Sequence, residues 1–119
     1  MCKMIHGEWK TALIDIDVDA DLSPEVDLGR PYDTVVIVCP ALAVSATVGL
    51  MVAEKSGGTY QDLYLVKSDG TNVQILSSAY TAVVFTWVVP IGGFQFIKVK
   101  LSADQTGADK TFRVMGVRS

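Results

Sequence analysis

Hydrophobic and polar positions alternate with a period of two along most of this chain. Residues 12–18 place apolar side chains at the even positions and mostly acidic side chains at the odd ones. Residues 95–101 place Ile97, Val99 and Leu101 on one face and Lys98 and Lys100 on the other. Because successive side chains of a strand point to opposite faces, this alternation predicts half-buried β-strands.

Turn signals divide the alternating segments into about eight or nine strands. Asp69-Gly70 is a strong hairpin dipeptide, and the pairs Gly57-Gly58 and Gly92-Gly93 also indicate turns. No segment has a long helical stripe. We therefore expect an all-β, antiparallel β-sandwich with jelly-roll-like connectivity, with an immunoglobulin-like topology as the alternative. The predicted strands are residues 12–18, 25–28, 32–39, 45–54, 60–67, 73–76, 80–89, 95–101 and 111–117.

The length and composition suit one folded domain. The chain has 119 residues, 50% of them hydrophobic, which is enough to bury a single core. We predict an N-terminal arm at residues 1–10 and a single β-sandwich domain at residues 11–119. Residues 1–10 lack the apolar core of a secretory signal, and no apolar run approaches the ~20 residues that span a bilayer.

The charge pattern argues against two classes of partner. The net charge is −3 and the ten basic residues are scattered, whereas binding to phosphates needs clustered Lys and Arg. An acidic membrane surface would be an equally poor partner. We expect neither nucleic acid nor membrane to be bound.

Two features invite a chemical interpretation, and neither predicts a site. Asp15, Asp17, Asp19 and Asp21 form an alternating acidic run, but both reading frames lack the glycine and glutamate of a helix-loop-helix calcium loop. A solvated acidic strand edge is the expected role, with a weak cation site as the alternative. His6 is the only histidine and has no partners for zinc binding or nucleophilic catalysis. We expect no enzyme activity, metal or cofactor.

The two cysteines do not form a disulfide scaffold. Cys2 and Cys39 are the whole set, and we expect both to be reduced, with Cys39 packed as a small hydrophobic residue. A single Cys2–Cys39 bridge is the alternative.

Several segments carry more apolar surface than a two-layer sandwich can hide. Val35–Val38 and Val83–Phe85 are apolar on both faces, and Phe94 and Phe96 alternate in register with Lys98 on the expected outer face. Such strands need a second cover. We therefore expect contact with a neighbouring protein. The candidate interface residues are Trp9, Val36, Val38, Val84, Phe94 and Phe96.

The aromatic residues also allow a sugar-stacking interpretation. Phe85 and Trp87 share one face of a predicted strand, and we assign them to the core. Trp9 and Tyr60 lie in terminal and turn regions and are the better candidates for stacking against a glycan.

From about residue 13 onward the chain resembles small structural proteins of tailed bacteriophages. The resemblance is carried by residues 23–29, 53–63, 92–103 and 109–118, including the strings Gly-Phe-Gln-Phe-Ile-Lys and Thr-Phe-Arg-Val-Met-Gly. It implies a virion protein assembled in the host cytoplasm, most simply a capsid decoration, cement or head auxiliary protein. Such a protein would form homo-oligomers and bind the major capsid protein or another virion protein. A neck, tail or fibre component is the alternative.

The chain is also similar to discoidin-type carbohydrate-binding jelly rolls. The strings Val-Asp-Leu-Gly at 26–29, Ser-Asp-Gly-Thr-Asn at 68–72 and Phe-Ile-Lys-Val at 96–99 carry this likeness. It implies the same kind of fold but a glycan as the ligand. The chain lacks the paired cysteines that usually join the ends of that family.

Overall fold

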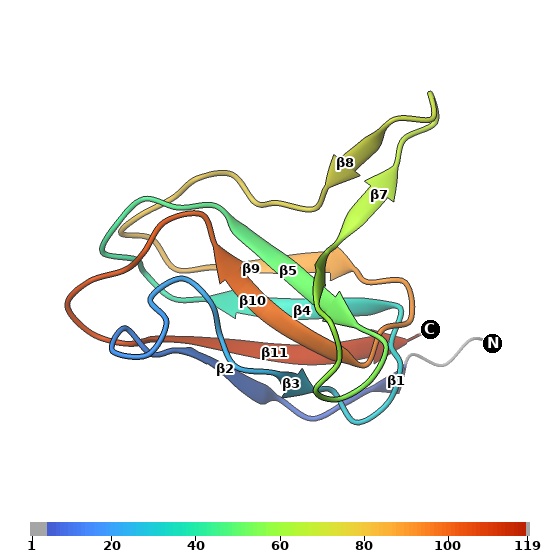
Figure 1. Cartoon of the computed structure of the whole chain (residues 1–119), viewed down its shortest axis with the longest axis horizontal. Coiled ribbons are helices and arrows are strands. Elements are labelled where there is room, and N and C mark those ends of the chain that lie inside the picture. Colours follow the sequence, from blue (N-terminus) through green and yellow to red (C-terminus); the bar gives the residue numbers. More distant parts are fainter. Residues whose placement is uncertain (1–4, 119) are drawn as a thin grey trace.

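The computed structural model describes residues 5–118, which form β-strands joined by turns and loops (Figure 1). The strands are β1 (Ile5–His6), β2 (Lys10–Ile14), β3 (Val26–Asp27), β4 (Thr34–Cys39), β5 (Val48–Ala53), β6 (Gln61–Asp62), β7 (Tyr64–Val66), β8 (Asn72–Gln74), β9 (Phe85–Pro90), β10 (Phe96–Leu101) and β11 (Lys110–Arg118). No helix occurs between residues 5 and 118.

The strands form two antiparallel sheets that pack face to face. Sheet I has the order β2-β11-β4-β9, with the short β1 also paired to β11, and sheet II has the order β3-β10-β5-β6. Apart from the pairs β1–β2 and β5–β6, successive strands of the sandwich fall in opposite sheets. This strand order is that of an eight-stranded jelly roll, so the predicted all-β sandwich and its connectivity are confirmed.

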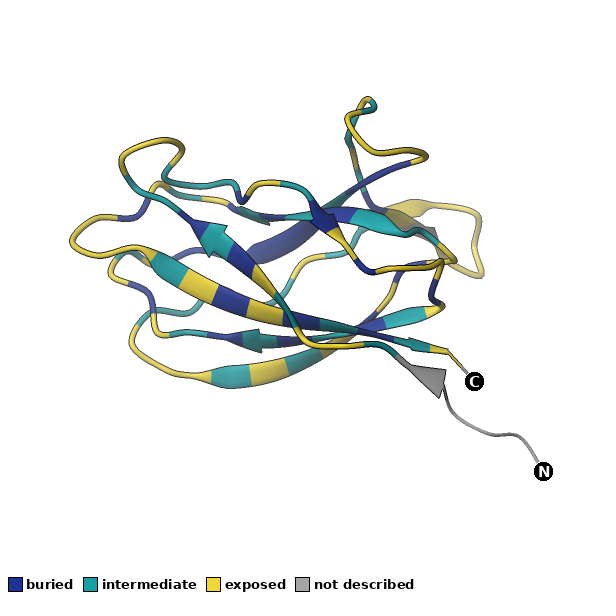
Figure 2. Cartoon of the chain, turned by 90° about the horizontal axis from the view of Figure 1, so that it is seen from below, coloured by how far each residue is buried: buried dark blue, intermediate teal, exposed yellow. Residues whose placement is uncertain are grey.

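The inner faces of the two sheets make one apolar core. Along β4, β10 and β11, buried and less buried residues alternate, as Figure 2 shows in the alternating colours of the strands. Full burial of each such side chain stabilises the fold by about 1.5–3 kcal/mol. The largest completely buried side chains are Phe112, Ile14, Ile37, Leu50, Ile91, Ile97 and Leu101.

The acidic run leaves the sheet earlier than the alternation predicts. Strand β2 ends at Ile14, and Asp15 then accepts backbone hydrogen bonds from Val18 and Asp19 in a tight turn. The Asp15 carboxylate also accepts from the Asp17 N–H at 3.0 Å. The expected strand over 12–18 is therefore too long, because aspartate side chains compete for backbone donors. Val18, expected inside, is 82% exposed.

The predicted strand over 80–89 is also shorter, because the chain changes sheet within it. Tyr80 exchanges backbone hydrogen bonds with Ala46, just before β5 of sheet II. From Phe85 onward the chain pairs with β4 of sheet I. The crossing segment between them carries Val83 and Val84 at the surface, where they are 59% and 64% exposed.

A two-stranded hairpin, β7–β8, extends away from the sandwich (Figure 1). Its tip is closed by Gly70, which has a φ of 88°, and by the Asp69 carboxylate, which accepts from the N–H and hydroxyl of Thr71. The expected strand over 60–67 is thus split into β6, paired with β5, and β7, which belongs to the hairpin.

Candidate interaction surface

The outer face of sheet I carries a continuous row of apolar side chains. In the strand register, Val36 of β4 lies opposite Val88 of β9 on one side and Met115 of β11 on the other. Directly opposite residues of antiparallel strands have Cβ atoms about 4.5–5.5 Å apart, so the three side chains adjoin. We call Val88, Val36 and Met115 the apolar row. Val88 is 60% exposed, and the other two are half-buried.

The residues on either side of the row are mixed in character. Val38 lies between Thr86 and Arg113, and Thr34 lies between Pro90 and Val117. The predicted interface residues Val36 and Val38 therefore share one face. Val88 and Met115 were not identified from the sequence, because only the register of β9 and β11 against β4 aligns them with Val36.

Trp9 lies beside this face and is held there by Arg113. The Arg113 guanidinium carbon is 5.2 Å from the centroid of the indole ring, within the range of a cation–π contact. Trp9 is still 41% exposed. Because the cation covers one face of its ring, Trp9 offers less area for stacking against a sugar than the sequence implies.

Val84 belongs to the open edge of sheet I. It precedes β9, which is the last strand of that sheet. Together with Val83 it extends the exposed apolar surface past the end of β9. Val84 is therefore accessible at the surface.

Phe94 and Phe96 lie elsewhere, so the six predicted interface residues do not form one surface. Phe96 is on sheet II, opposite Asp27 and Ala53. Phe94 is partly buried and packs against the core.

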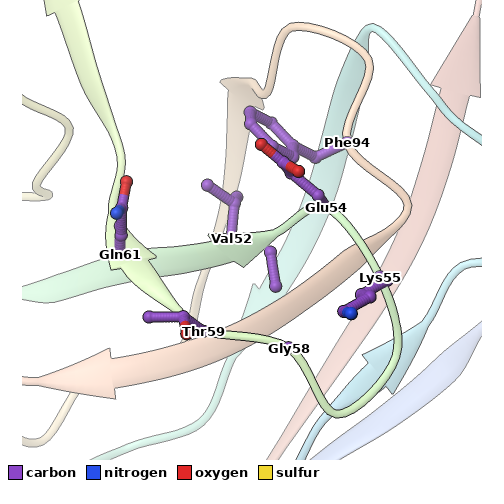
Figure 3. Close-up of a pocket in the computed structure, with 8 residues that line it drawn as sticks. Val52, Glu54, Lys55, Gly58, Thr59, Gln61 and Phe94 are labelled. Carbon is purple, nitrogen blue, oxygen red and sulfur yellow. The ribbon is translucent and has the colours of Figure 1, made fainter.

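Phe94 lines an open cavity of about 300 Å³ near the loop between β5 and β6. Figure 3 shows its ring next to Glu54, with Gln61 and Thr59 on the other side of the cavity. All these polar side chains are exposed or half-buried. The cavity therefore has a polar, solvent-accessible lining.

Tyr60 lies on the other side of the same loop, where its hydroxyl donates a hydrogen bond to Glu25. The Glu25 carboxylate accepts hydrogen bonds from the Tyr60 hydroxyl, the Ser56 hydroxyl and the Gly57 N–H. The Ser56, Tyr60 and Gly57 donors hold the pKa of Glu25 below its ordinary value, while burial and the Glu25 charge raise the pKa of Tyr60. Lys98 Nζ lies 4.6 Å from the centre of the Tyr60 ring. Tyr60 thus ties the loop to the segment before β3.

Among the described residues, no set of ionisable side chains is arranged as a metal site. No group of three or more His, Cys, Asp and Glu side chains within the described residues is placed to hold a metal ion. In the acidic turn, a hydrogen bond with Asp19 raises the pKa of Asp21. The side chain of His6 and all of Cys2 lie outside the described residues, so the expectations for both stay predictions.

Cys39 is buried in the core of sheet I. Burial raises the pKa of its thiol to about 12. The side chain is therefore a neutral apolar residue at neutral pH, as its sequence context predicts.

Within residues 5–118 no helix is long and apolar enough to cross a membrane.

The comparisons with known proteins identify related folds only. No protein-family model matches this chain, and neither does any curated protein sequence. The SPBc2 prophage-derived protein YomS superposes with a TM-score of 0.54 at 13% identity, over 98% of both chains. At that identity the likeness shows a common fold over the whole chain.

Two other solved structures superpose less well. The K3 cleaved adhesin domain of Lys-gingipain from Porphyromonas gingivalis w83 gives a TM-score of 0.45 at 9% identity, over 93% of this chain and 73% of that one. The capsid asymmetric unit of cyanophage Pam1 gives 0.36 at 21% identity, over 97% and 81%.

Proposed function

We propose that this chain is a non-enzymatic structural protein of a bacteriophage virion that attaches to the particle through the outer face of sheet I. The observation that carries the proposal is the apolar row of Val88, Val36 and Met115, which crosses three adjacent strands. Antiparallel sheets usually turn a polar outer face to water. A partner that covers the row would gain the burial of apolar area.

The sequence resemblance to phage structural proteins supports this assignment. The phage origin of YomS, which shares the fold over its full length, agrees with it. Within the virion, capsid decoration is the role we propose: the chain would bind the major capsid protein and strengthen the head by buried area. A stable contact of this kind covers about 800 Å² on each partner and needs no catalytic group.

The row sits on a rigid support, which favours a preformed docking surface. Strands β4 and β11 lie in the interior of sheet I, and β9 is paired with β4 at its edge. The inward residues of β4 and β11, such as Val35, Ile37 and Val114, are completely buried. Binding would therefore order little additional backbone, so less of the contact energy is offset by lost conformational entropy.

Attachment to particles tests the proposal. Phages are prepared in which the gene encodes the wild-type chain, the V88D variant or the V66D variant. The particles are then separated from free protein on a density gradient. Val88 is 60% exposed in the row and Val66 is 70% exposed on the β7–β8 hairpin, so neither change disturbs the core. Mass spectrometry then measures the amount of this chain per particle.

We expect the wild-type and V66D proteins to sediment with the particles and V88D to be reduced at least tenfold on them. A virion role would be excluded if the wild-type chain were absent from purified particles. Loss of V66D with retention of V88D would instead place the contact on the hairpin and overturn the assignment to sheet I. Cryo-electron microscopy of wild-type particles distinguishes the head from the neck or tail.

A further inference from the structure

A second cavity, of about 240 Å³, lies on the outer face of sheet II. Gly49 of β5 is part of its lining and contributes no side chain there. Lys100 of β10 lies directly opposite Gly49, and Asp62 of β6 lies opposite Met51, the next outward position along β5. The Lys100 and Asp62 side chains approach each other on this face, with Lys100 Nζ near the Asp62 carboxylate.

The polar pair in this cavity is incompletely satisfied. Lys100 Nζ is 3.6 Å from Asp62 Oδ1, longer than the 2.7–2.9 Å of a charge-assisted hydrogen bond. Asp62 Oδ1 is shielded from solvent, and no described residue gives it a hydrogen bond. Buried polar atoms without a partner are uncommon in folded proteins, and an unmodified carboxylate oxygen can accept more than one donor. The Asp62 side chain as a whole is 31% exposed and lines the cavity, so the accessible part of its carboxylate can accept from a bound molecule.

The rest of the lining combines hydrogen-bonding and apolar groups. The Gln74 amide can donate and accept, and the Ser102 hydroxyl accepts from the Thr47 N–H, which leaves its own proton to donate. Leu76 closes one side: its Cδ2 would lie only 2.7 Å from a Cβ at position 49. A glycine here therefore leaves room for Leu76.

We propose that this cavity binds a single pyranose unit of a glycan. A sugar hydroxyl both donates and accepts, so one hydroxyl can donate to Asp62 and accept from Lys100 without separating the pair. Gln74 and Ser102 are available for neighbouring hydroxyls, and Leu76 offers an apolar wall to the C–H groups of the ring. A small cavity with a few convergent polar groups is the usual form of such a site.

This site goes beyond the proposed virion role and is independent of it. The cavity opens on the outer face of sheet II, whereas the apolar row is on the outer face of sheet I, and the two faces of a sandwich point in opposite directions. A chain attached by sheet I would keep the cavity open to solvent. Sugar binding can be measured on the isolated protein whether or not it attaches to a particle.

Nuclear magnetic resonance titration of the ¹⁵N-labelled chain tests the proposal. The probes are the methyl α-glycosides of glucose, galactose and mannose, and N-acetylglucosamine, each added separately. We expect at least one to shift the amide signals of Gly49 and Ser102, with a dissociation constant on the order of 1 mM, as for other small neutral ligands. Gly58, at the cavity of Figure 3, should not shift.

Matched variants locate the site. D62N removes the charge of the Asp62 carboxylate, and Q74A removes an amide from a half-buried position of the hairpin strand β8. Each change should weaken binding about tenfold. E54Q makes the same chemical change as D62N in the other cavity and should leave binding unchanged. Q74A keeps the test valid if D62N fails to fold, which thermal unfolding measures.

Two results would overturn the inference. One is that none of the four sugars shifts Gly49 at concentrations up to about 50 mM, well above the dissociation constants expected for single sugars. The other is that a sugar binds but the shifts gather at Gly58 and are lost in E54Q while Q74A binds normally, which would place the site beside Phe94.

Discussion

The ring of Tyr32 lies against the backbone of Gly116, in the space where any other residue at position 116 would place its Cβ. Tyr32 is 4% exposed and precedes β4, whereas Gly116 is near the end of β11. Glycine within a strand commonly marks such a close approach. The contact joins the end of the last strand to the loop that enters sheet I, so it fixes the edge of the core near both ends of the chain.

Replacing Gly116 with alanine should destabilise the fold. The added Cβ would overlap the Tyr32 ring, and overpacking of this kind costs about 1–3 kcal/mol. Urea unfolding of G116A followed by tryptophan fluorescence measures the loss. T111A, at an exposed position of the same strand, is the control and should change stability by less than about 0.5 kcal/mol. Equal stability of G116A and wild type would show that Tyr32 can move aside freely.

Gln105 should be a main anchor of the loop between β4 and β5. It is 3% exposed, its Oε1 accepts from the Ala43 and Val44 N–H groups at 3.0 Å, and its Nε2 donates to the Val44 carbonyl. Q105A leaves these backbone groups without a partner, which costs about 1–3 kcal/mol. Hydrogen exchange at the Val44 amide should accelerate together with the loss of stability. Unchanged exchange there would mean that water replaces the side chain at no cost.

Stability should fall in acid partly because of Glu25. Its three donors lower its pKa in the folded state, so the stabilisation is complete above the ordinary value of 4.5 and is lost as the pH falls below it. Urea midpoints between pH 7 and pH 3 measure this. E25Q should be less stable than wild type at pH 7, and the difference should narrow toward pH 3. A difference that stays constant over this range would mean that the charge of Glu25 contributes nothing.

The thiol of Cys39 should not react in the folded protein. Its pKa is raised to about 12, so the thiolate that attacks disulfide reagents is scarce at pH 8, and the residue is completely buried. In a C2S background, labelling by a disulfide reagent should be at least a hundredfold slower in buffer than in 8 M urea, where the chain is unfolded. Fast labelling in buffer would indicate that β4 opens readily. Because the folded pKa lies above the unfolded one, stability should also decline as the pH rises above 9.

The strands that the sequence identifies best are those with strict alternation and clear turns. Residues 97–101 have both, and the structure places Ile97, Val99 and Leu101 inside, as predicted. The prediction failed where local hydrogen bonding or a change of partner strand overrides alternation. The carboxylate of Asp15 accepts a backbone hydrogen bond and ends β2. The predicted strand over 80–89 is shortened because Tyr80 pairs with Ala46, next to sheet II, whereas Phe85 pairs with Cys39 of sheet I.

The candidate surface could be predicted only in part. The two-sided apolar character of Val35–Val38 is visible in the sequence, and Val36 and Val38 are half-buried on the outer face of sheet I. Its neighbours Val88 and Met115 come from strands about 50 and 80 residues away, and their alignment depends on register. Phe94, which alternation places outside, is partly buried against the core and lines the cavity near the loop between β5 and β6.

Alternation and turn chemistry alone determined that this chain is all-β and forms a sandwich, because the period of two and the positive φ of turn glycines are local properties. Tertiary structure decided which strands are neighbours, and therefore which side chains form a surface or a cavity. The apolar row and the Asp62–Lys100 pair across β5 each join three strands, so no local pattern contains them. Long-range pairing in the jelly roll brings them together.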